Sequence, residues 1–183
     1  MLFAHDTEVA LASAASLVNT RRGGRERLTD QAALEDWLEE NPFTGSREHT
    51  DTELAAVRRV RERIRAVWEA PDRDAAAAAT NELLQRTAST PRLTRHGDWD
   101  WHIHASMPSD PLAHRIGAEA AMGFVDLIRS DDLARLRTCA ADDCDAVLVD
   151  LSRNRSRRYC DTGNCGNRAH VAAYRARRAA AGA

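Results

Sequence analysis

The sequence predicts a mostly helical α+β protein, with a helical N-terminal body that contains one small β-hairpin, followed by a separate C-terminal module. Two observations lead to this prediction. Apolar residues recur at three- and four-residue spacing through most of the first 130 residues, and they alternate with polar ones only in a short segment at 92–105. All four cysteines lie in the last 45 residues, in two close pairs. We therefore expect a body at 1–130 and a module at 133–183.

Charge is distributed unevenly along the 183 residues. The net charge is only −2, with 43% hydrophobic and 30% charged residues, which is typical of a globular chain. Residues 1–132 hold 16 arginines against 23 acids, whereas residues 133–183 hold 10 arginines against 5 acids. An acidic body with a basic end indicates that the C-terminal part meets a polyanion.

No segment approaches the apolar length that spans a bilayer. The apolar start of the chain is interrupted by Asp6 and Glu8, with no basic region before it, so we interpret it as a core helix. We expect a cytoplasmic protein with no membrane association. In a reducing compartment, paired cysteines hold metal more often than they form disulfides.

The first helices are predicted from their caps and breaks. We expect a helix at 6–18 capped by Asp6, and an exposed loop at 19–29 that contains Gly23-Gly24. Asp30 begins a second helix, whose apolar side consists of Leu34, Trp37 and Leu38 and which ends at Asn41-Pro42.

The strongest amphipathic helix follows a predicted capping box, Thr50-x-x-Glu53. Its arginine- and glutamate-rich face is interpreted as a solvated surface with ion pairs rather than a binding surface. Asp72, after Pro71, starts an alanine-rich helix that ends near Leu83 and Leu84. The apolar positions of the amphipathic helix are Leu54, Val57, Val60, Ile64, Val67 and Trp68.

A hairpin is predicted at 92–105, with a tight turn at 96–98. Trp99, Trp101, Ile103 and Ala105 alternate with Asp98, Asp100, His102 and His104, as in a half-buried strand. The histidine and aspartate face is compatible with a metal site, with a small-molecule pocket, or with a polar face satisfied by water or neighbouring helices. Asp110-Pro111 then opens the last helix of the body, with an apolar stripe at Leu112, Ile116, Ala120, Phe124, Leu127 and Ile128.

The cysteines follow the pattern Cys139-x4-Cys144 and Cys160-x4-Cys165. Two matched pairs with no spare cysteine predict one structural Zn²⁺, because four thiolates fill a tetrahedron and leave no position for water. A four-thiolate iron site and free cysteines are the alternatives. A strand at Ala146–Val149 and a helix after Cys165 complete a treble-clef-like zinc finger.

Arginines surround these ligands and form the second layer of the module. Zinc would hold the 152–159 segment rigidly between the two pairs, and Arg168, Arg175 and Arg178 fall near one side of the final helix. Such residues suit nucleic-acid phosphates, although a docking face for the acidic body or for a partner protein is the alternative. The candidate contacts are Arg153, Asn154, Arg155, Arg157, Arg158, Asn167, Arg168, Arg175 and Arg178.

The motifs Leu136-Arg137-x-Cys139, Asp150-x-Ser152-Arg153-Asn154, Arg157-Arg158-Tyr159-Cys160 and Cys165-Gly166-Asn167-Arg168 resemble the CGNR zinc finger. The body is similar to the ABATE domain, with Leu17-Val18-Asn19-Thr20 matching its early motif. This resemblance implies a bacterial stress-induced transcription regulator whose ligands are the four cysteines. At Val149-Asp150-Leu151-Ser152 the chain departs from the expected pattern, which has a phenylalanine earlier and a threonine before the serine.

The function predicted from all of this is DNA binding in transcriptional control, with the body as sensor or dimerisation unit. A small-molecule effector and a homodimer fit that prediction. An RNA- or protein-interaction zinc module is one alternative, and a small-molecule-binding protein or enzyme that uses His102 and His104 is another. We expect no enzyme and no catalytic residues, because the chain contains no recognisable nucleophile–base pair, P-loop or dinucleotide fingerprint.

Overall fold

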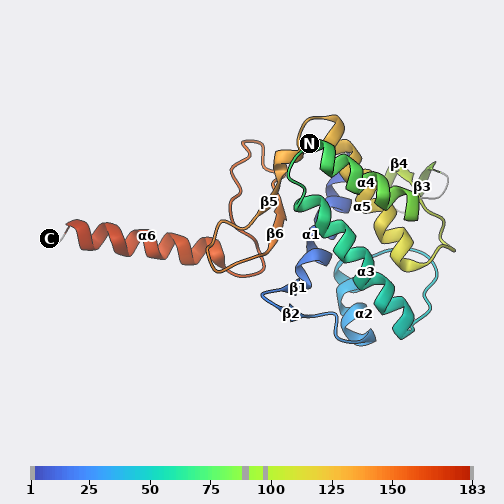
Figure 1. Ribbon diagram of the computed structural model, residues 1–183, viewed down its shortest axis with the longest axis horizontal. Coiled ribbons are helices and arrows are strands. Elements are labelled where there is room, and N and C mark those ends of the chain that lie inside the picture. The colour runs from blue at the N-terminus through green and yellow to red at the C-terminus, as the bar shows by residue number, and fades with distance from the viewer. Residues whose placement is uncertain (1–2, 88–90, 97–98, 182–183) are drawn as a thin grey trace.

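A computed structural model describes residues 3–87, 91–96 and 99–181 of the chain. The described elements form a compact helical body, a small finger beside it and one helix that extends outward (Figure 1). In chain order they are α1 (His5–Asn19), β1 (Arg21–Arg22), β2 (Arg25–Glu26), α2 (Gln31–Glu40), α3 (Asp51–Trp68), α4 (Arg73–Thr87), β3 (Arg92–His96), β4 (Trp99–His104), α5 (Leu112–Arg129), a 3₁₀ turn (Leu133–Arg135), β5 (Leu136–Thr138), β6 (Val147–Val149) and α6 (Cys165–Ala181).

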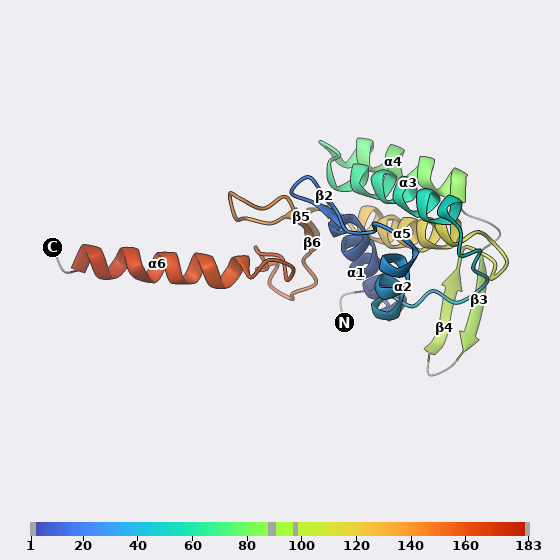
Figure 2. The same ribbon diagram turned by 90° about the horizontal axis from the view of Figure 1, so that it is seen from below.

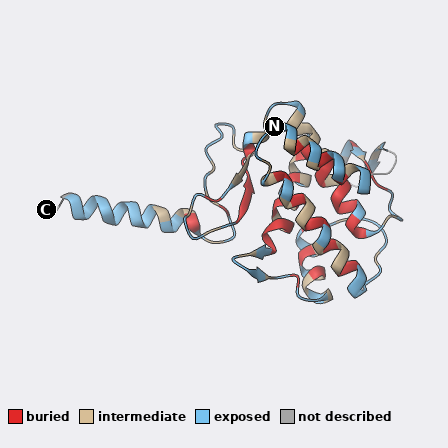
Figure 3. Ribbon diagram, viewed as in Figure 1, coloured by how far each residue is buried: buried red, intermediate tan, exposed pale blue. Residues whose placement is uncertain are grey.

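Helix α5 is the central element of the body and packs against α1, α3 and α4. The stripe predicted for it is confirmed, since Ile116, Phe124 and Leu127 are buried. Phe124 meets Trp68 of α3 edge to face, with ring centroids 5.3 Å apart. Figure 3 shows the buried positions on the sides of the body helices that face one another. Within the described residues, no helix has the length and apolar character needed to cross a membrane.

Side-chain caps set several helix starts as predicted. The carboxylate of Asp30 accepts from Ala33 N at 2.9 Å, and that of Asp72 accepts from Ala75 N at 2.8 Å. Thr50 Oγ1 accepts from Glu53 N at 3.2 Å. A capping box also requires the Glu53 carboxylate to accept from Thr50 N. This part of the prediction is wrong, because the Glu53 carboxylate accepts instead from Glu48 N and His49 N.

Two predicted caps are wrong by one or two positions. Helix α1 begins at His5 with Ala4 as its N-cap, so Asp6 lies inside the first turn, where its charge suits the helix dipole. Helix α5 has Pro111 as its N-cap, and no side-chain cap bond is formed there. The Asp110 carboxylate accepts from Met107 N at 2.6 Å and thereby closes the preceding turn.

The exposed loop predicted at 19–29 is instead a β1–β2 hairpin. Gly23 and Gly24 form its turn at φ +57° and +71°, a conformation that glycine adopts without strain. Arg61 of α3, only 2% exposed, holds the hairpin by donating to both Glu26 carboxylate oxygens at 2.7 and 2.6 Å. Arg65 donates to the carbonyls of Val18 and Arg21. The ion pairs predicted for α3's arginine face are present, but Arg61 is buried against the hairpin rather than solvated.

The β3–β4 hairpin is confirmed, but its faces are reversed. Leu93 pairs with Ile103 and Thr94 with His102, and the hairpin projects from the end of the body (Figure 2). Trp101 is 63% exposed and Ile103 45% exposed, whereas His102 is 8% exposed. The predicted turn at 97–98, including Asp98, lies outside the described residues. His104 Nδ1 lies 3.6 Å from Glu119 Oε1 of α5, whereas the ring nitrogens of His102 meet groups of β4 itself, Asp100 O and His104 Nε2.

A four-cysteine metal centre and an arginine-bearing helix

Each cysteine is placed by a different local structure. Strand β5 leads into Cys139, whose N–H donates to Ala146 O at 2.8 Å and closes the first knuckle. Cys144 lies on that knuckle. Cys160 follows the loop after β6, and its N–H donates to Cys139 Sγ at 3.4 Å. Cys165 is the first residue of α6. The two pairs are thereby brought together from segments far apart in the sequence.

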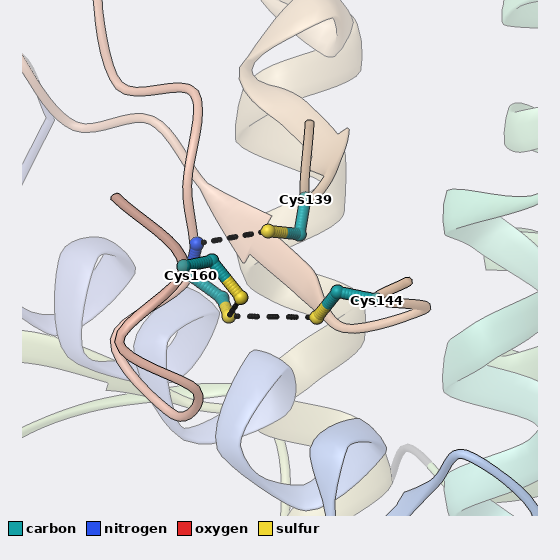
Figure 4. A group of neighbouring side chains, drawn as sticks. Cys139, Cys144 and Cys160 are labelled. Carbon is teal, nitrogen blue, oxygen red and sulfur yellow. Dashed lines mark hydrogen bonds between the residues drawn. The ribbon is translucent and has the colours of Figure 1, made fainter. Parts of the chain in front are cut away.

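The four sulfur atoms converge on one point. They all lie within 4.8 Å of one another, and Figure 4 shows the labelled cysteines Cys139, Cys144 and Cys160 gathered around it. The Cys144–Cys160 and Cys160–Cys165 sulfur distances are 3.7 and 3.8 Å. A tetrahedron with metal–sulfur bonds of about 2.3 Å has edges of about 3.8 Å, so the spacing fits Zn²⁺ and is far too long for a disulfide.

The chemistry of the donor set also fits a divalent cation. Burial raises the pKa of Cys144 to about 12, and the neighbouring sulfurs add to the rise. Burial opposes ionisation of Cys160 as well, yet hydrogen bonds from Thr162 and the other cysteines lower its pKa to about 7. Four thiolates at this distance repel one another strongly unless a cation lies between them. The cation would supply cross-linking of the two knuckles and no catalytic position.

Arg168 adds positive charge beside the sulfurs. Its guanidinium donates to both Asp143 oxygens, at 2.5 and 2.9 Å, and to Cys165 Sγ at 3.2 Å. The ion pair with Asp143, followed by the bond to Cys165, raises the pKa of Arg168. The N-terminus of α6 points its partial positive charge at the same sulfur. Both features stabilise thiolates.

The finger is joined to the body by paired hydrogen bonds. Asn19, at the end of α1, donates to Val147 O and accepts from Val147 N, both at 2.8 Å. At the tip of the β1–β2 hairpin, Gly23 N donates to the Asp145 carboxylate at 2.9 and 3.0 Å, and Arg22 donates to Thr162. The hairpin thus contacts both metal knuckles, one just after Cys144 and one between Cys160 and Cys165.

Comparison with known families agrees with this arrangement. The ABATE model, described as "Putative stress-induced transcription regulator", matches residues 11–131, and the CGNR zinc finger model matches residues 135–178. The chain belongs to the ABATE family. It carries a CGNR zinc finger with one structural Zn²⁺ site formed by Cys139, Cys144, Cys160 and Cys165. No curated protein matches the chain.

Asp150 organises the arginine-rich loop of the CGNR finger. It is fully buried, and its carboxylate accepts from Ser152 N at 3.0 Å, Ser152 Oγ at 2.5 Å and Arg157 N at 2.9 Å. Burial alone would raise its pKa, but these bonds and Arg137 lower it. The motif that contains Asp150 did not by itself predict this role. The available signal was a lone acid between an apolar strand and a run of arginines.

The predicted nucleic-acid contacts separate into two groups. Arg155, Arg157 and Arg168 are ion-paired within the chain, to Asp132, Asp161 and Asp143 respectively. Asn154 and Asn167 are exposed and carry no charge. Arg177 belongs with the unpaired group and was missed by the sequence analysis. The exposed arginines at 133–181 that have no ion pair among the described residues, here called the open arginines, are Arg153, Arg158, Arg175, Arg177 and Arg178.

Helix α6 leaves the CGNR finger and extends away from the ABATE body (Figures 1 and 2). Every residue from 171 to 180 is exposed, including the apolar Val171 at 41% and Tyr174 at 54%. Three of the open arginines, Arg175, Arg177 and Arg178, lie on this exposed part. The zinc centre anchors only the first turn of the helix.

The predicted ligand pair His102 and His104 lies on the ABATE body, on a different element from the finger. Their rings are 4.9 Å apart, and His104 Nδ1 lies 3.6 Å from Glu119 Oε1 of α5. Across the ranges that the structure describes, only the four cysteines bring three or more metal-ligand atoms together. The metal interpretation of the histidine face therefore finds no support in the described residues.

Proposed function

We propose that this ABATE protein binds DNA in transcriptional control, with the CGNR finger as the reading element and the ABATE body as the sensor. The observation that carries the proposal is α6, a 17-residue helix anchored at one end by the zinc centre and exposed along the rest of its length. A helix with no apolar face buried in its own chain is stabilised by contact with a partner. The charge of this helix favours a polyanion.

The dimensions of α6 suit the DNA major groove. Seventeen residues at about 1.5 Å each make a helix of about 26 Å, and the groove, about 12 Å wide, accepts one α-helix. Arg175 and Arg178 then lie within reach of phosphates, while Val171 and Tyr174 offer apolar contacts to base edges such as the thymine methyl group. Arg153 and Arg158 extend the basic surface to the loop beside the zinc centre.

Acidic groups of the chain do not cover this surface. Asp132, Asp143 and Asp161 neutralise Arg155, Arg168 and Arg157, and these pairs hold the finger together. The open arginines keep their charge available for phosphates. A protein-interaction module would also use an exposed helix, but three arginines on its last turns favour nucleic acid.

The proposal is tested by DNA affinity as a function of salt concentration. Fragments of the source genome recovered with the purified protein serve as ligands, and fluorescence anisotropy measures binding. Replacing Arg175 and Arg178 by Gln should lower affinity and flatten the slope of log affinity against log salt by about 0.9 per lost phosphate contact. Arg86→Gln, an exposed arginine of α4 that pairs with Glu82, is the matched control and should leave the slope unchanged.

Two results would contradict the proposal. Binding that does not change with salt, or no binding to any DNA fragment, removes the role of the open arginines. Tighter binding to structured RNA than to duplex DNA in direct competition would instead identify an RNA-binding module.

We further propose that the protein is not an enzyme, because its metal centre has four thiolate ligands and no position for a reacting water.

A further inference from the structure

A cavity of about 260 Å³ lies where α3, α4 and α5 meet. Helix α4 ends at this cavity and α5 begins there, whereas the other end of α5 leads into the finger (Figure 1). Val60, Thr87 and Ala113 are buried and form its floor. Gly117 of α5 allows the close packing below, because a Cβ atom there would lie 2.6 Å from Thr87 Cγ2 and 2.9 Å from Val60 Cγ2. The volume suits a ligand smaller than the drug-sized molecules that fill about 300–1,000 Å³.

Positive groups surround this floor. Arg59 and Arg63 of α3, Arg86 of α4 and His114 of α5 line the cavity, and no aspartate or glutamate is among the described residues that line it. The cavity therefore differs in charge from the acidic body that contains it. Arg86 is already paired with Glu82 at 2.9 Å. The charges that are left for a ligand are those of Arg59 and Arg63.

The sequence of α3 leaves Arg59 and Arg63 without an ion pair among the described residues. The two arginines are four residues apart, and like charges at this spacing on a helix repel each other. Glu62 is the one acid within four residues of either arginine, and its carboxylate pairs with Arg21 at 3.3 Å and with Arg61 at 3.1 Å. An oxyanion in the cavity would relieve the repulsion and accept charge-assisted hydrogen bonds from the guanidinium groups.

The first turn of α5 adds donors to the same cavity. Ala113 and His114 lie in that turn, Pro111 is the N-cap, and no side chain among the described residues caps the helix. A helix N-terminus carries partial positive charge and backbone N–H groups, and both favour an anion. The His114 imidazole, whether neutral or protonated, has at least one N–H to donate. Two separate helices, α3 and α5, therefore favour negative charge in one place.

We propose that this cavity binds a small organic anion, with a carboxylate or phosphate group at Arg59 and Arg63 and an apolar part on the floor formed by Val60 and Ala113. The inference rests on the sensor role proposed for the ABATE body and names the chemical class of its effector. A cation would be repelled by the arginines, and a neutral molecule would leave their charges without a partner.

The test uses three probes that share a phenyl ring: benzoate, phenyl phosphate and neutral benzamide. Two-dimensional NMR of the isotope-labelled, zinc-loaded full-length chain, at low salt and without DNA, follows the arginine Nε–H signals during each titration. The tighter-binding anion should bind at least about 10-fold more tightly than benzamide and should move the Arg59 and Arg63 signals, because it accepts charge-assisted hydrogen bonds. Because DNA is absent, failure here is distinct from failure of DNA binding.

Variants locate the bound anion. Arg63→Gln should weaken anion binding at least about 3-fold, and the double variant Arg59→Gln with Arg63→Gln should weaken it about 10-fold or more. Ala56→Leu should weaken it by filling the cavity without changing charge. The matched control is the double variant Arg25→Gln with Arg27→Gln, which removes two exposed arginines outside the lining and should bind as the parent does.

Three results would overturn the proposal: equal affinity for benzamide and the two anions, binding of no probe, or anion affinity that is unchanged in the double variant of Arg59 and Arg63. A DNA duplex that moves the signals of these two arginines as the anions do would also overturn it, because the cavity would then contact the DNA backbone. Both arginines are at least partly exposed, so their replacement leaves the core intact, and a thermal-denaturation scan of each variant confirms that it is folded.

Discussion

The arginines of the CGNR finger have two different roles, and the groups that each arginine contacts distinguish these roles. Arg168 donates to Asp143 and to Cys165 Sγ, so its charge is used within the metal centre. Arg158, ten residues earlier, is exposed and has no ion pair among the described residues. Residue type alone does not separate the two roles, because both are arginines beside a zinc ligand.

Replacing Arg168 should therefore affect zinc retention, whereas replacing Arg158 should affect DNA binding. Arg168→Gln removes a positive charge from a thiolate, so zinc should pass to a competing chelator about 10-fold faster or more, the size typical of lost outer contacts at metal sites. Arg158→Gln should leave zinc retention unchanged and weaken DNA binding. A colorimetric chelator assay and fluorescence anisotropy provide the two measurements. Equal zinc release from both variants would contradict this assignment.

Asn19 is the second residue whose role is specific. Its buried amide pairs with both backbone groups of Val147, as a neighbouring strand would. Asn19→Ala should lower the free energy of unfolding by about 1–3 kcal/mol for each backbone group left unpaired. Urea denaturation measures the loss, with exposed Asn81→Ala of α4 as the control. An Asn19→Ala variant as stable as the control would show that water replaces the amide.

At the scale of single elements, β4 shows how tertiary contacts choose a face. Alternation predicted a strand correctly, and the apolar residues were expected to be buried. The structure turns His102 inward and leaves Trp101 outside, where Arg95 lies over the indole at 5.4 Å. His102 Nδ1 meets Asp100 O at 2.7 Å, His102 Nε2 meets His104 Nε2 at 3.1 Å, and His104 Nδ1 lies 3.6 Å from Glu119 Oε1, so the inward polar groups have partners and their burial is not prohibitive.

The reversed face of β4 has a direct consequence for stability. Trp101→Ser should change the free energy of unfolding by no more than about 0.5 kcal/mol, because an exposed side chain loses little on replacement. His102→Ala should cost about 1–3 kcal/mol, because it leaves the Asp100 carbonyl without its partner. Urea denaturation of the two variants decides the matter. A larger loss for Trp101→Ser than for His102→Ala would restore the orientation expected from hydropathy.

For the whole molecule, the finger and the body share contacts that make zinc important to both. Val147 and Val149 of β6 lie in the body's core, and the β1–β2 hairpin contacts both knuckles. Asn19, the last residue of α1, also holds Val147.

Removal of zinc should loosen the molecule unevenly. Without the cation the four thiols lose their cross-link, so amides at 139–165 should exchange with deuterium much faster, while those of α3 and α5 keep most of their protection. Hydrogen exchange followed by mass spectrometry, before and after chelation, measures this. Uniform loss of protection through α3 and α5 would show that the body has no stability of its own.

Acid should also destabilise the fold. Burial raises the pKa of Glu26 and of Glu53, but hydrogen bonds from Arg61 and Arg47 outweigh it and leave both pKa values below the usual 4.5. A carboxyl with a lowered folded-state pKa contributes stability above its unfolded pKa, and this contribution is lost as pH falls through the folded value. Unfolding free energy should therefore decline below about pH 4.5. Glu26→Gln should reduce the decline, as pH-dependent urea denaturation would show.

Local patterns were enough to predict most elements and the zinc ligands. Apolar spacing identified α3 and α5, and cysteine spacing identified a four-ligand site, because both depend on periodicity or on ligand count within a short stretch. Those predictions hold in the structure. The Gly-Gly break was visible too, although it makes a hairpin turn rather than an open loop.

Only the tertiary structure decided which polar groups meet. Arg61 with Glu26, Asn19 with Val147 and Arg168 with Asp143 are separated by 35, 128 and 25 residues. Such pairings depend on how helices and strands pack, and no local pattern encodes them. For the same reason the sequence could not tell which finger arginines stay open, or that β4 turns His102 inward. The burial of a polar side chain is set by the partner that it finds, and that partner comes from elsewhere in the chain.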